Sequence, residues 1–379
     1  MKAKHHYVPE WYQRRFIPAS SKDNNLWCLD IDPQPIAHPG GHHYHPNPLR
    51  RGADVCFHEP GLYTLRFGKH ASDVIETHFF GDIDRTGAVA VDAMADFVFG
   101  QKSPNIRHLA QYLDAQKMRT PKGLDLVKAM AKTEDHQSAV LLMRDISQIH
   151  MTILMEGVWE VFKCDHTSTK LLISDHPVAT YNRQLPPGGK EYQYPFDPGI
   201  DLIGTQSLYP LCSNRLLVIT NLEFVRNHWI NGKSQRTNPR AFGDTLFFLG
   251  NIHTGRQLNE GEVRAVNYII KRTAKKFIAA GEEEWLYPED TVKTKAWNNL
   301  GGEFFLRPDP RRMGFAGASY IGFKDGTSWG MDEYGRPPND DDPDLVAQRD
   351  REREYWAKTM AYWEQKRGPL PPGSMLGMP

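Results

Sequence analysis

The sequence predicts an α+β protein in which a helical first half packs on a mostly antiparallel sheet from the second half. Two changes in hydrophobic period lead to this prediction. Between residues 75 and 157 apolar residues recur at helical spacing, whereas short apolar or alternating runs from residue 158 to 249 indicate strands. In addition, helices and strands come in separate runs, which is typical of α+β folds and not of repeated βαβ units.

A change in composition near residue 285 predicts the domain organisation. We expect residues 1–284 to form one α+β domain. Residues 285–379 are richer in Gly, Pro and charged residues, so we expect them to form an appended arm. The last residues, 368–379, are expected to be disordered because they are rich in Gly and Pro and close to the end of the chain.

The arm contains one long predicted helix, over residues 343–367. Trp356, Met360 and Trp363 fall on one face of this helix. Such an aromatic face needs a partner surface, which is either the body of its own subunit or a second chain. We therefore expect this helix to contribute to a homo-oligomer.

Composition narrows the class of protein. Lys+Arg and Asp+Glu are both 46, so the global charge does not favour nucleic acid or an anionic membrane as a partner. The four cysteines (Cys28, Cys56, Cys164 and Cys212) lack CxxC spacing, which favours free thiols in a reducing compartment. No run approaches the ~20 apolar residues that span a bilayer. We expect a cytoplasmic protein without a membrane partner.

The opening of the chain is dense in polar and aromatic residues. His5 and His6 stand before Pro9, which suits the first turn of a helix because its missing N–H would have no partner there. We expect a short helix that ends near Phe16, with the two imidazoles presented just ahead of it. Because the segment is so aromatic, we expect it to pack into the body of the protein.

The other elements of the first half follow from periodicity. Ile75, Phe79 and Ile83 recur every four residues and predict a helix, with Glu76 on its flank. Another helix should end at Arg119, because the residue before a proline avoids the α region and Pro121 follows closely. The full set of predicted elements is a strand at 26–31, a loop at 32–60, a strand at 61–67, helices from 75 to 157, and a central buried helix at 136–158.

The second half reads as strands followed by a helix. We expect a hairpin of residues 159–164 and 170–173, an excursion loop at 183–200, strands at 208–211, 215–220 and 245–249, and an amphipathic helix at 263–277. Asn267 lies within the apolar face of that helix. It either binds neighbouring backbone or faces the site.

Several polar residues are candidates for a functional site. Glu76 is either an interhelical salt-bridge partner or a functional carboxylate, and Arg119 is either a surface residue or a buried counter-ion. Asp175 and His176 leave the end of an apolar strand, where they form either part of a site or a turn closed by Pro177. The histidines of residues 38–45 either bind a metal ion or remain exposed to solvent.

Four pieces of the chain resemble, in the same order, a bacterial family known as domain of unknown function 4238. They are His5-His6-Tyr7-Val8-Pro9, then Gly61-Leu62-Tyr63-Thr64 with Ile75-Glu76, then Arg119-Thr120-Pro121, and finally Ser174-Asp175-His176-Pro177. The family usually has Asn where His176 stands. The resemblance covers roughly residues 5 to 280. It implies a fold unit and a residue set, and it leaves the function open.

Two functions follow from these residues. The first is a metal-dependent hydrolase acting on a phosphodiester such as nucleic acid. Its expected catalytic residues are His5, His6, Glu76, Arg119 and Asp175, and its expected ligands for one divalent metal ion are His5, His6, Asp175 and His176. The second is a non-catalytic ligand- or protein-recognition module, in which the same His-Asp-Arg residues form a polar core network.

Overall fold

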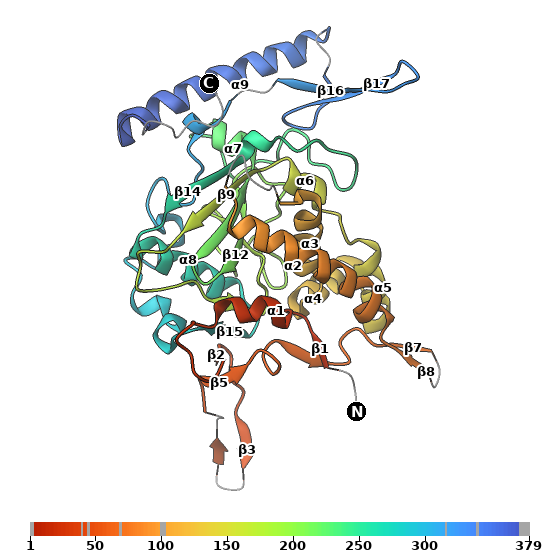
Figure 1. Ribbon diagram of the computed structural model, residues 1–379, viewed down its shortest axis with the longest axis vertical. Helices are drawn as coiled ribbons and strands as arrows, with labels where there is room; N and C mark the ends of the chain where they lie inside the picture. Colours follow the sequence, from red (N-terminus) through yellow and green to blue (C-terminus); the bar gives the residue numbers. More distant parts are fainter. Residues whose placement is uncertain are drawn as a thin grey trace.

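Two larger sheets, four two-stranded sheets, a group of helices and a C-terminal arm make up the computed structural model, which describes residues 4–38, 41–43, 46–67, 70–98, 104–314, 317–338 and 341–370. The helices of the first half lie beside the sheets, and the long helix α9 crosses one end of the molecule (Figure 1). The sheets are mostly antiparallel, and their main strands come from the second half of the chain. The α+β prediction is confirmed.

The larger sheet has five strands in the order β11-β12-β13-β9-β14. The strands predicted at 208–211 and 215–220 are confirmed, but the strand predicted at 245–249 is wrong. That stretch is irregular because its apolar side chains cover the sheet, as Phe247 does edge-on to Trp159 at 5.7 Å between ring centres. The strands are β9 (Val158–Lys163), β11 (Ala179–Asn182), β12 (Thr205–Cys212), β13 (Arg215–Thr220) and β14 (Ile252–Gln257), of which only β14 runs parallel to its neighbour.

The second sheet has four antiparallel strands in the order β10-β15-β2-β5. The hairpin predicted for 159–164 and 170–173 is wrong, because β9 and β10 belong to different sheets. Asn267 on the following helix donates to the carbonyl of Lys170 and accepts from the N–H of Leu172, which draws this stretch away from β9. The strands are β2 (Asn25–Asp30), β5 (Leu49–Gly52), β10 (Ile173–Ser174) and β15 (Phe277–Ala280).

Helices are confirmed in the region predicted to be helical, residues 75–157, with bounds set by local capping. Asn105, Thr120 and Asp135 each accept an N–H of the first turn that follows them. The helix predicted over 136–158 is wrong in its length, since it ends at Asp145 and the chain then turns through Gln148 at a φ of 76°. The helices are α2 (Gly81–Ala95), α3 (Ile106–Met118), α4 (Pro121–Ala131), α5 (His136–Asp145) and α6 (Met151–Met155), and a π-helical turn, η2 (Ile75–Phe80), precedes α2.

Two helices of the second half complete the domain. The amphipathic helix α8 (Glu260–Thr273) begins with a capping box between Asn259 and Glu262. It ends before the predicted 277, because Phe277 pairs with Asp30 as the first residue of β15. A short helix, α7 (Leu222–Arg226), follows β13, and a 3₁₀ turn, η3 (Leu249–Asn251), precedes β14.

The predicted loop at 32–60 is wrong, because it contains four short strands, β3 to β6. The strand predicted at 61–67 starts only at Leu65, because Gly61 adopts a φ of 72° within a turn. His45 lies outside the described residues, and the role of the histidine segment stays a prediction. The short strands of this region are β3 (Ile36–His38), β4 (Gly41–His43), β6 (His58–Pro60), β7 (Leu65–Phe67) and β8 (His70–Ser72).

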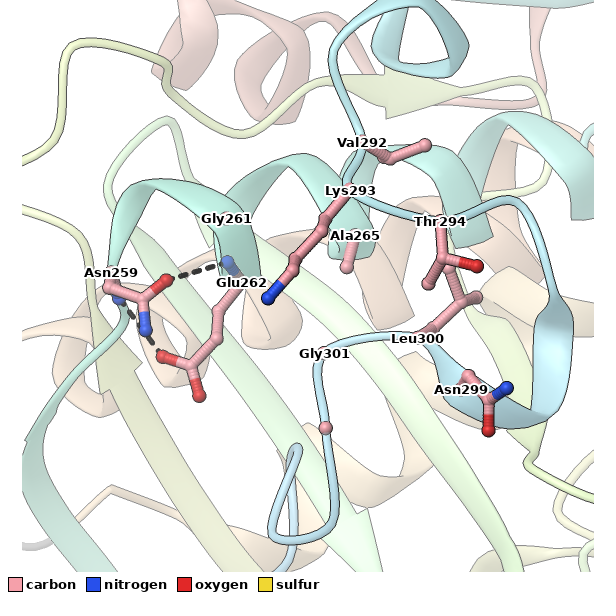
Figure 2. Close-up of a pocket in the computed structure, with 11 residues that line it drawn as sticks. Asn259, Gly261, Glu262, Ala265, Val292, Lys293, Thr294, Asn299, Leu300 and Gly301 are labelled. Atoms are coloured by element: carbon pink, nitrogen blue, oxygen red, sulfur yellow. Dashed lines mark hydrogen bonds between the residues drawn. The ribbon is translucent and has the colours of Figure 1, made fainter.

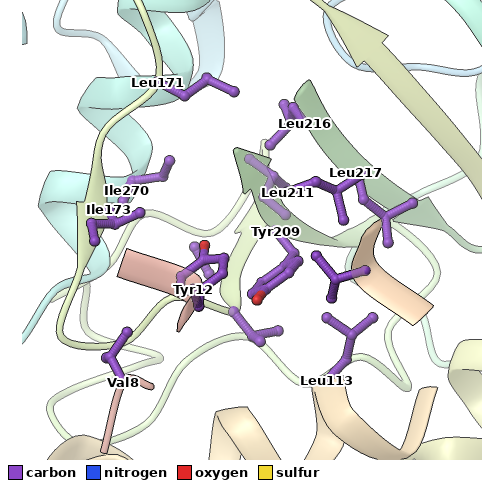
Figure 3. Close-up of a cluster of buried hydrophobic side chains, with 14 of the residues drawn as sticks. Val8, Tyr12, Leu113, Leu171, Ile173, Tyr209, Leu211, Leu216, Leu217 and Ile270 are labelled. Atoms are coloured by element: carbon purple, nitrogen blue, oxygen red, sulfur yellow. The ribbon is translucent and has the colours of Figure 1, made fainter. Parts of the chain in front are cut away.

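The N-terminal segment is part of the hydrophobic core. After β1 (Lys4–His6), the chain forms the predicted helix as α1 (Glu10–Gln13) and a 3₁₀ turn, η1 (Arg14–Phe16). Val8, Tyr12 and Phe16 are fully buried, and Tyr12 lies among the leucines and isoleucines of the core in Figure 3. Its ring stacks on Tyr209 at 5.0 Å, and its hydroxyl donates to the carbonyl of Pro210 at 2.7 Å. The predicted packing of this segment is confirmed.

The arm continues the core before it leaves the body. Leu286, Leu300 and Leu306 are buried in the same hydrophobic cluster as the N-terminal segment. The division at residue 284 stays a prediction. The elements of the arm before its long helix are η4 (Glu283–Leu286), η5 (Pro288–Asp290), η6 (Trp297–Asn299), η7 (Pro310–Arg312), β16 (Ala318–Gly322) and β17 (Ser328–Asp332).

The long helix α9 (Pro343–Arg367) has the predicted bounds, and its aromatic face docks on its own chain. Trp363 is buried against Phe304, with 4.4 Å between ring centres. The indole N–H of Trp356 donates to the carbonyl of Pro310 at 3.2 Å. Because the body of the same chain accounts for this face, the face no longer motivates a homo-oligomer, which stays a prediction.

Two expectations from composition can be compared with the described residues. All four cysteines are free thiols, as predicted. Among the described residues, none of the helices is both long enough and apolar enough to cross a membrane.

Tyr12→Ala should lower the free energy of unfolding by about 3–5 kcal/mol, because it removes a fully buried aromatic ring and leaves the cavity unfilled. Urea unfolding followed by tryptophan fluorescence measures this loss. Arg14→Ala in the same segment is the control, since this side chain is 63% exposed and its pair with Glu10 is a surface pair. Equal effects of the two substitutions would show that the segment is peripheral.

Candidate functional site

The two histidines at the start of the chain point to opposite sides of a strand. In β1, His5 pairs with Glu59 and His6 with His58 of β6. His5 is 1% exposed, whereas His6 is part-exposed. The Nε2 of His6 lies 3.2 Å from the carbonyl oxygen of Asp54. The two imidazoles therefore face different surroundings and are not brought together as the predicted pair.

His5 is held by the turn that follows β6. Its Nδ1 accepts the N–H of Tyr63 at 2.9 Å, and its ring stacks on the ring of Tyr63 at 5.4 Å. Because Nδ1 is an acceptor, the ring proton is on Nε2, which lies 3.3 Å from a carboxylate oxygen of Asp73. Burial lowers the pKa of His5, and the neighbouring Asp73 acts in the opposite direction.

Arg119 is a buried counter-ion, which is one of the two interpretations the sequence left open. It follows the last turn of α3 and is 1% exposed. Its guanidinium donates Nη1–H to Asp84 at 3.0 Å, and its Nη2 lies 2.8 Å from the other oxygen of the same carboxylate. Its Nε donates to Gln116 at 2.8 Å, and the amide of Gln116 donates to the carbonyl of Tyr7 at 2.8 Å. The predicted surface role of Arg119 is wrong.

Glu76 lies close to this ion pair. One of its carboxylate oxygens, Oε2, is buried without a hydrogen-bond partner. Burial raises its pKa to about 7, Arg119 acts to lower it, and Asp84 and Asp73 raise it further. A carboxyl group that titrates near neutral pH is suited to proton transfer.

Three of the five predicted catalytic residues therefore surround one tyrosine. His5 stacks on Tyr63, the Tyr63 hydroxyl donates to the carbonyl oxygen of Arg119, and Glu76 is near enough to raise the pKa of that hydroxyl. We call His5, Tyr63, Glu76, Asp84 and Arg119 the Tyr63 cluster.

Asp175 performs a different task. It is 2% exposed, and its carboxylate accepts the backbone N–H groups of Lys275, Lys276 and Phe277 at 2.9, 2.6 and 2.8 Å. Burial raises its pKa, and the three N–H groups act in the opposite direction. No described hydrogen bond or ion pair joins Asp175 to His5 or His6. The carboxylate holds the chain between α8 and β15.

His176 faces the junction of α3 and α4. Its Nδ1 lies 2.8 Å from the hydroxyl of Thr120, and its Nε2 is buried 3.7 Å from an oxygen of Asp197, too far for a hydrogen bond. Burial holds its pKa well below the usual 6.5.

The four predicted metal ligands thus have different partners. His5 and His6 diverge, Asp175 binds backbone, and His176 faces Thr120. Within the described part of the chain, no three or more His, Cys, Asp or Glu side chains are grouped so that they could hold a metal ion. The divalent ion and its ligand set stay a prediction, and the described residues do not bring the four ligands together.

A cavity of about 460 Å³ lies elsewhere, between the start of α8 and residues 292–302. Figure 2 shows Asn259 and Glu262 bonded to each other at its edge, through the N–H groups of both residues at 3.0 Å. Glu262 also lies 3.4 Å from Arg256. Since these polar groups have protein partners, and no predicted site residue lines the cavity, we do not place the site there.

A smaller cavity, about 170 Å³, lies where α3 meets α4. We call it the α3–α4 cavity. Its lining includes His176 and three charged residues that the sequence did not single out, Lys117, Lys122 and Asp197. The two lysines flank Arg119-Thr120-Pro121, and Asp197 belongs to the predicted excursion loop. Proximity to a predicted helix break was the only sequence signal that could have found the lysines.

The pKa of Glu76 predicts a pH-dependent stability. Below its usual pKa of 4.5 the carboxyl is protonated in both the folded and the unfolded chain, and above about 7 it is ionised in both. The folded state therefore loses up to about 3 kcal/mol as the pH rises through this range. Glu76→Gln should stabilise the protein at pH 8 more than at pH 5, as measured by urea unfolding. Glu59→Gln, at an exposed position of β6, is the control, and equal effects of Glu76→Gln at both pH values would contradict the burial argument.

Comparison with known proteins gives one match. The model of a family described as "Protein of unknown function (DUF4238)" matches residues 4–284, which include the Tyr63 cluster, Asp175 and the α3–α4 cavity. No curated protein and no solved structure matches the chain. Since the family model covers well over half of the sequence, the chain belongs to the DUF4238 family.

Proposed function

We propose that this protein is a non-catalytic recognition module, in which the His-Asp-Arg residues form a polar core that holds a ligand-binding surface in place. One observation carries the proposal. The carboxylate of Asp175, the residue on which the hydrolase hypothesis depends most, accepts three backbone N–H groups. A carboxylate used in this way positions the chain, and it has little capacity left for a metal ion or a substrate.

Arg119 supports the same proposal. Its guanidinium is bonded to Asp84 and Gln116 and lies over the ring of Phe80, 5.3 Å from its centre. A buried arginine with this many protein partners is a structural counter-ion, because leaving it unpaired costs several kcal/mol. The predicted catalytic guanidinium is thus already used by the fold.

Asp175→Ala tests the structural role directly. We expect the free energy of unfolding to fall by about 3 kcal/mol, because three N–H groups lose a charged acceptor. Asp175→Asn is the matched variant, and it should lose less because its amide oxygen still accepts. Urea unfolding measures both. Ordinary surface substitutions change the free energy of unfolding by roughly 0.5 kcal/mol or less. A change no larger than this for Asp175→Ala would contradict the proposal.

A metal-dependent phosphodiester hydrolase is the second candidate, and one observation favours it. Glu76 carries a buried, unbonded carboxylate oxygen and a pKa of about 7, beside the positive charge of Arg119. Such a group could act as a general base at neutral pH.

The two candidates differ in what the purified protein does with metal ions. We expect no stoichiometric metal by elemental analysis, and no hydrolysis of bis(p-nitrophenyl) phosphate with Mg²⁺, Mn²⁺ or Zn²⁺ added. Hydrolysis that is lost in Glu76→Gln and kept in Glu59→Gln would establish the hydrolase and overturn the recognition module.

A further inference from the structure

The α3–α4 cavity is built by five separate parts of the domain, one of which is His150 at the start of α6. The last turn of α3 contributes Lys117, and the first turn of α4 contributes Lys122 and Gly123. His176 enters after β10, and the segment around Asp197 closes another side. The cavity therefore lies within the folded domain and does not depend on one mobile loop.

Two nitrogen atoms at this cavity lack the partners that buried polar atoms normally have. The Nζ of Lys117 and the Nε2 of His176 are both buried, and neither has a hydrogen-bond partner in the structure. His176 as a whole is 2% exposed, whereas the stem of Lys117 is part-exposed. Other buried side-chain atoms of the described residues also lack a partner, so what distinguishes Lys117 and His176 is that their unbonded nitrogens belong to residues lining the same cavity.

Both nitrogen atoms are best described as donors. An ammonium group can only donate. For His176, the hydroxyl of Thr120 lies 2.8 Å from Nδ1 and 3.3 Å from its other acceptor, the carbonyl of Lys117, so the shorter contact favours donation to Nδ1. The ring proton is then on Nε2, which faces Asp197 at 3.7 Å.

The carboxylates near the cavity are already paired. Asp197 accepts from Lys122 at 2.7 Å, and Lys122 also donates to the carbonyl of Thr273 at 2.9 Å. Asp114, which lies behind the cavity, accepts the backbone N–H of His150 at 3.1 Å and contacts its ring Nδ1 at 2.9 Å. Lys117 has neither carboxylate within ion-pair distance.

The first turn of α4 also favours an anion in the cavity. This helix runs over eleven residues, and Thr120 caps it by accepting the N–H of Gly123 at 3.1 Å. The N-terminal end of a helix carries a partial positive charge and N–H groups without helical acceptors. In this turn Pro121 has no N–H and the N–H of Gly123 is bonded to Thr120, so the partial positive charge of the helix end, more than its N–H groups, favours an anion beside Lys122 and Gly123, which line the cavity.

We propose that the α3–α4 cavity is the ligand-binding site of the module and takes a phosphate-sized oxyanion, bound by Lys117, His176 and the start of α4. This inference rests on the proposed recognition function. The volume of about 170 Å³ corresponds to roughly five or six water molecules. A phosphoryl group fits this space, while the larger molecule that carries it would extend from the open side.

Inorganic phosphate is the probe for the full-length protein, and acetate and chloride at equal ionic strength are the comparison ions. We expect phosphate to raise the melting temperature of the natural protein in a saturable way, because it binds the folded state alone. A rise with acetate as large as the rise with phosphate would instead assign the cavity to carboxylate ligands and overturn the phosphoryl preference.

Lys117→Met removes the ammonium and keeps the length of the side chain. We expect this variant to melt higher than the natural protein without phosphate, because an unpaired buried charge is gone, and to lose the response to phosphate. His176→Asn, which keeps a polar contact for Thr120 but removes Nε2, should weaken phosphate binding at least tenfold by titration calorimetry. Lys128→Met on α4, whose side chain does not line the cavity, is the matched control and should bind normally.

Each outcome bears on one proposal. Phosphate binding that survives Lys117→Met, or that is equally weak in Lys128→Met, would overturn the assigned site. No phosphate response in a folded, metal-free protein would overturn the oxyanion site and leave the recognition module standing. Metal-dependent turnover of a phosphodiester would overturn the proposed function itself. The calorimetric titration would still decide separately whether the cavity binds phosphate.

Discussion

The ion pair between Arg119 and Asp84 fixes the arrangement of the elements around the N-terminal segment. Arg119 ends α3, and Asp84 lies on α2, so the pair joins the two helices. Through Gln116 the same guanidinium is linked to the carbonyl of Tyr7, and the carbonyl of Arg119 accepts the hydroxyl of Tyr63. A buried guanidinium that loses its partner is costly, which means that these elements can meet in few other ways. The aromatic packing of Tyr12 and Tyr209 then adds apolar burial to an arrangement already set by charge.

The break between α3 and α4 connects this network to the cavity. Arg119 turns its side chain toward Asp84, while the next residue, Thr120, caps α4 and contacts His176. Gly123 is required in the first turn of α4, because a Cβ there would lie 2.3 Å from the carbonyl oxygen of Met118. The close approach of the two helix ends therefore brings Lys117 and Lys122 to the same cavity. Near this turn of the backbone, Arg119 is bonded to Asp84, whereas the ammonium of Lys117, two residues earlier, has no hydrogen-bond partner.

Features that depend on local periodicity could be predicted from the sequence. Strand pairing and side-chain bonds between residues far apart in the sequence could not. The helices of the first half and α9 were predictable because apolar spacing and capping residues are local signals. The pairing of β10 with β15 was not, since the two strands are about a hundred residues apart. The three residues of β1 are a strand only because β6 pairs with them, and the alternation of that strand sends His5 and His6 to opposite sides. Asp175 was correctly expected to leave the end of a strand, but no pattern near it indicates its bonds to the backbone at 275–277.

The candidate polar residues of this domain fall into two kinds, according to whether protein groups satisfy their hydrogen bonds. Asp175, Arg119 and Gln116 are bonded to protein, and a fully bonded polar network makes one conformation rigid. Glu76, Lys117 and His176 each carry a buried atom that the protein leaves unbonded. Burial without a partner costs free energy, so such an atom gains when water, an ion or a ligand supplies the missing bond. Because Thr120 contacts His176 and directly follows Arg119, the bonded residues hold the unbonded ones in position. Under the proposed function, the residues first taken for catalytic groups serve as the frame, and the proposed binding atoms are those of Lys117 and His176 beside them.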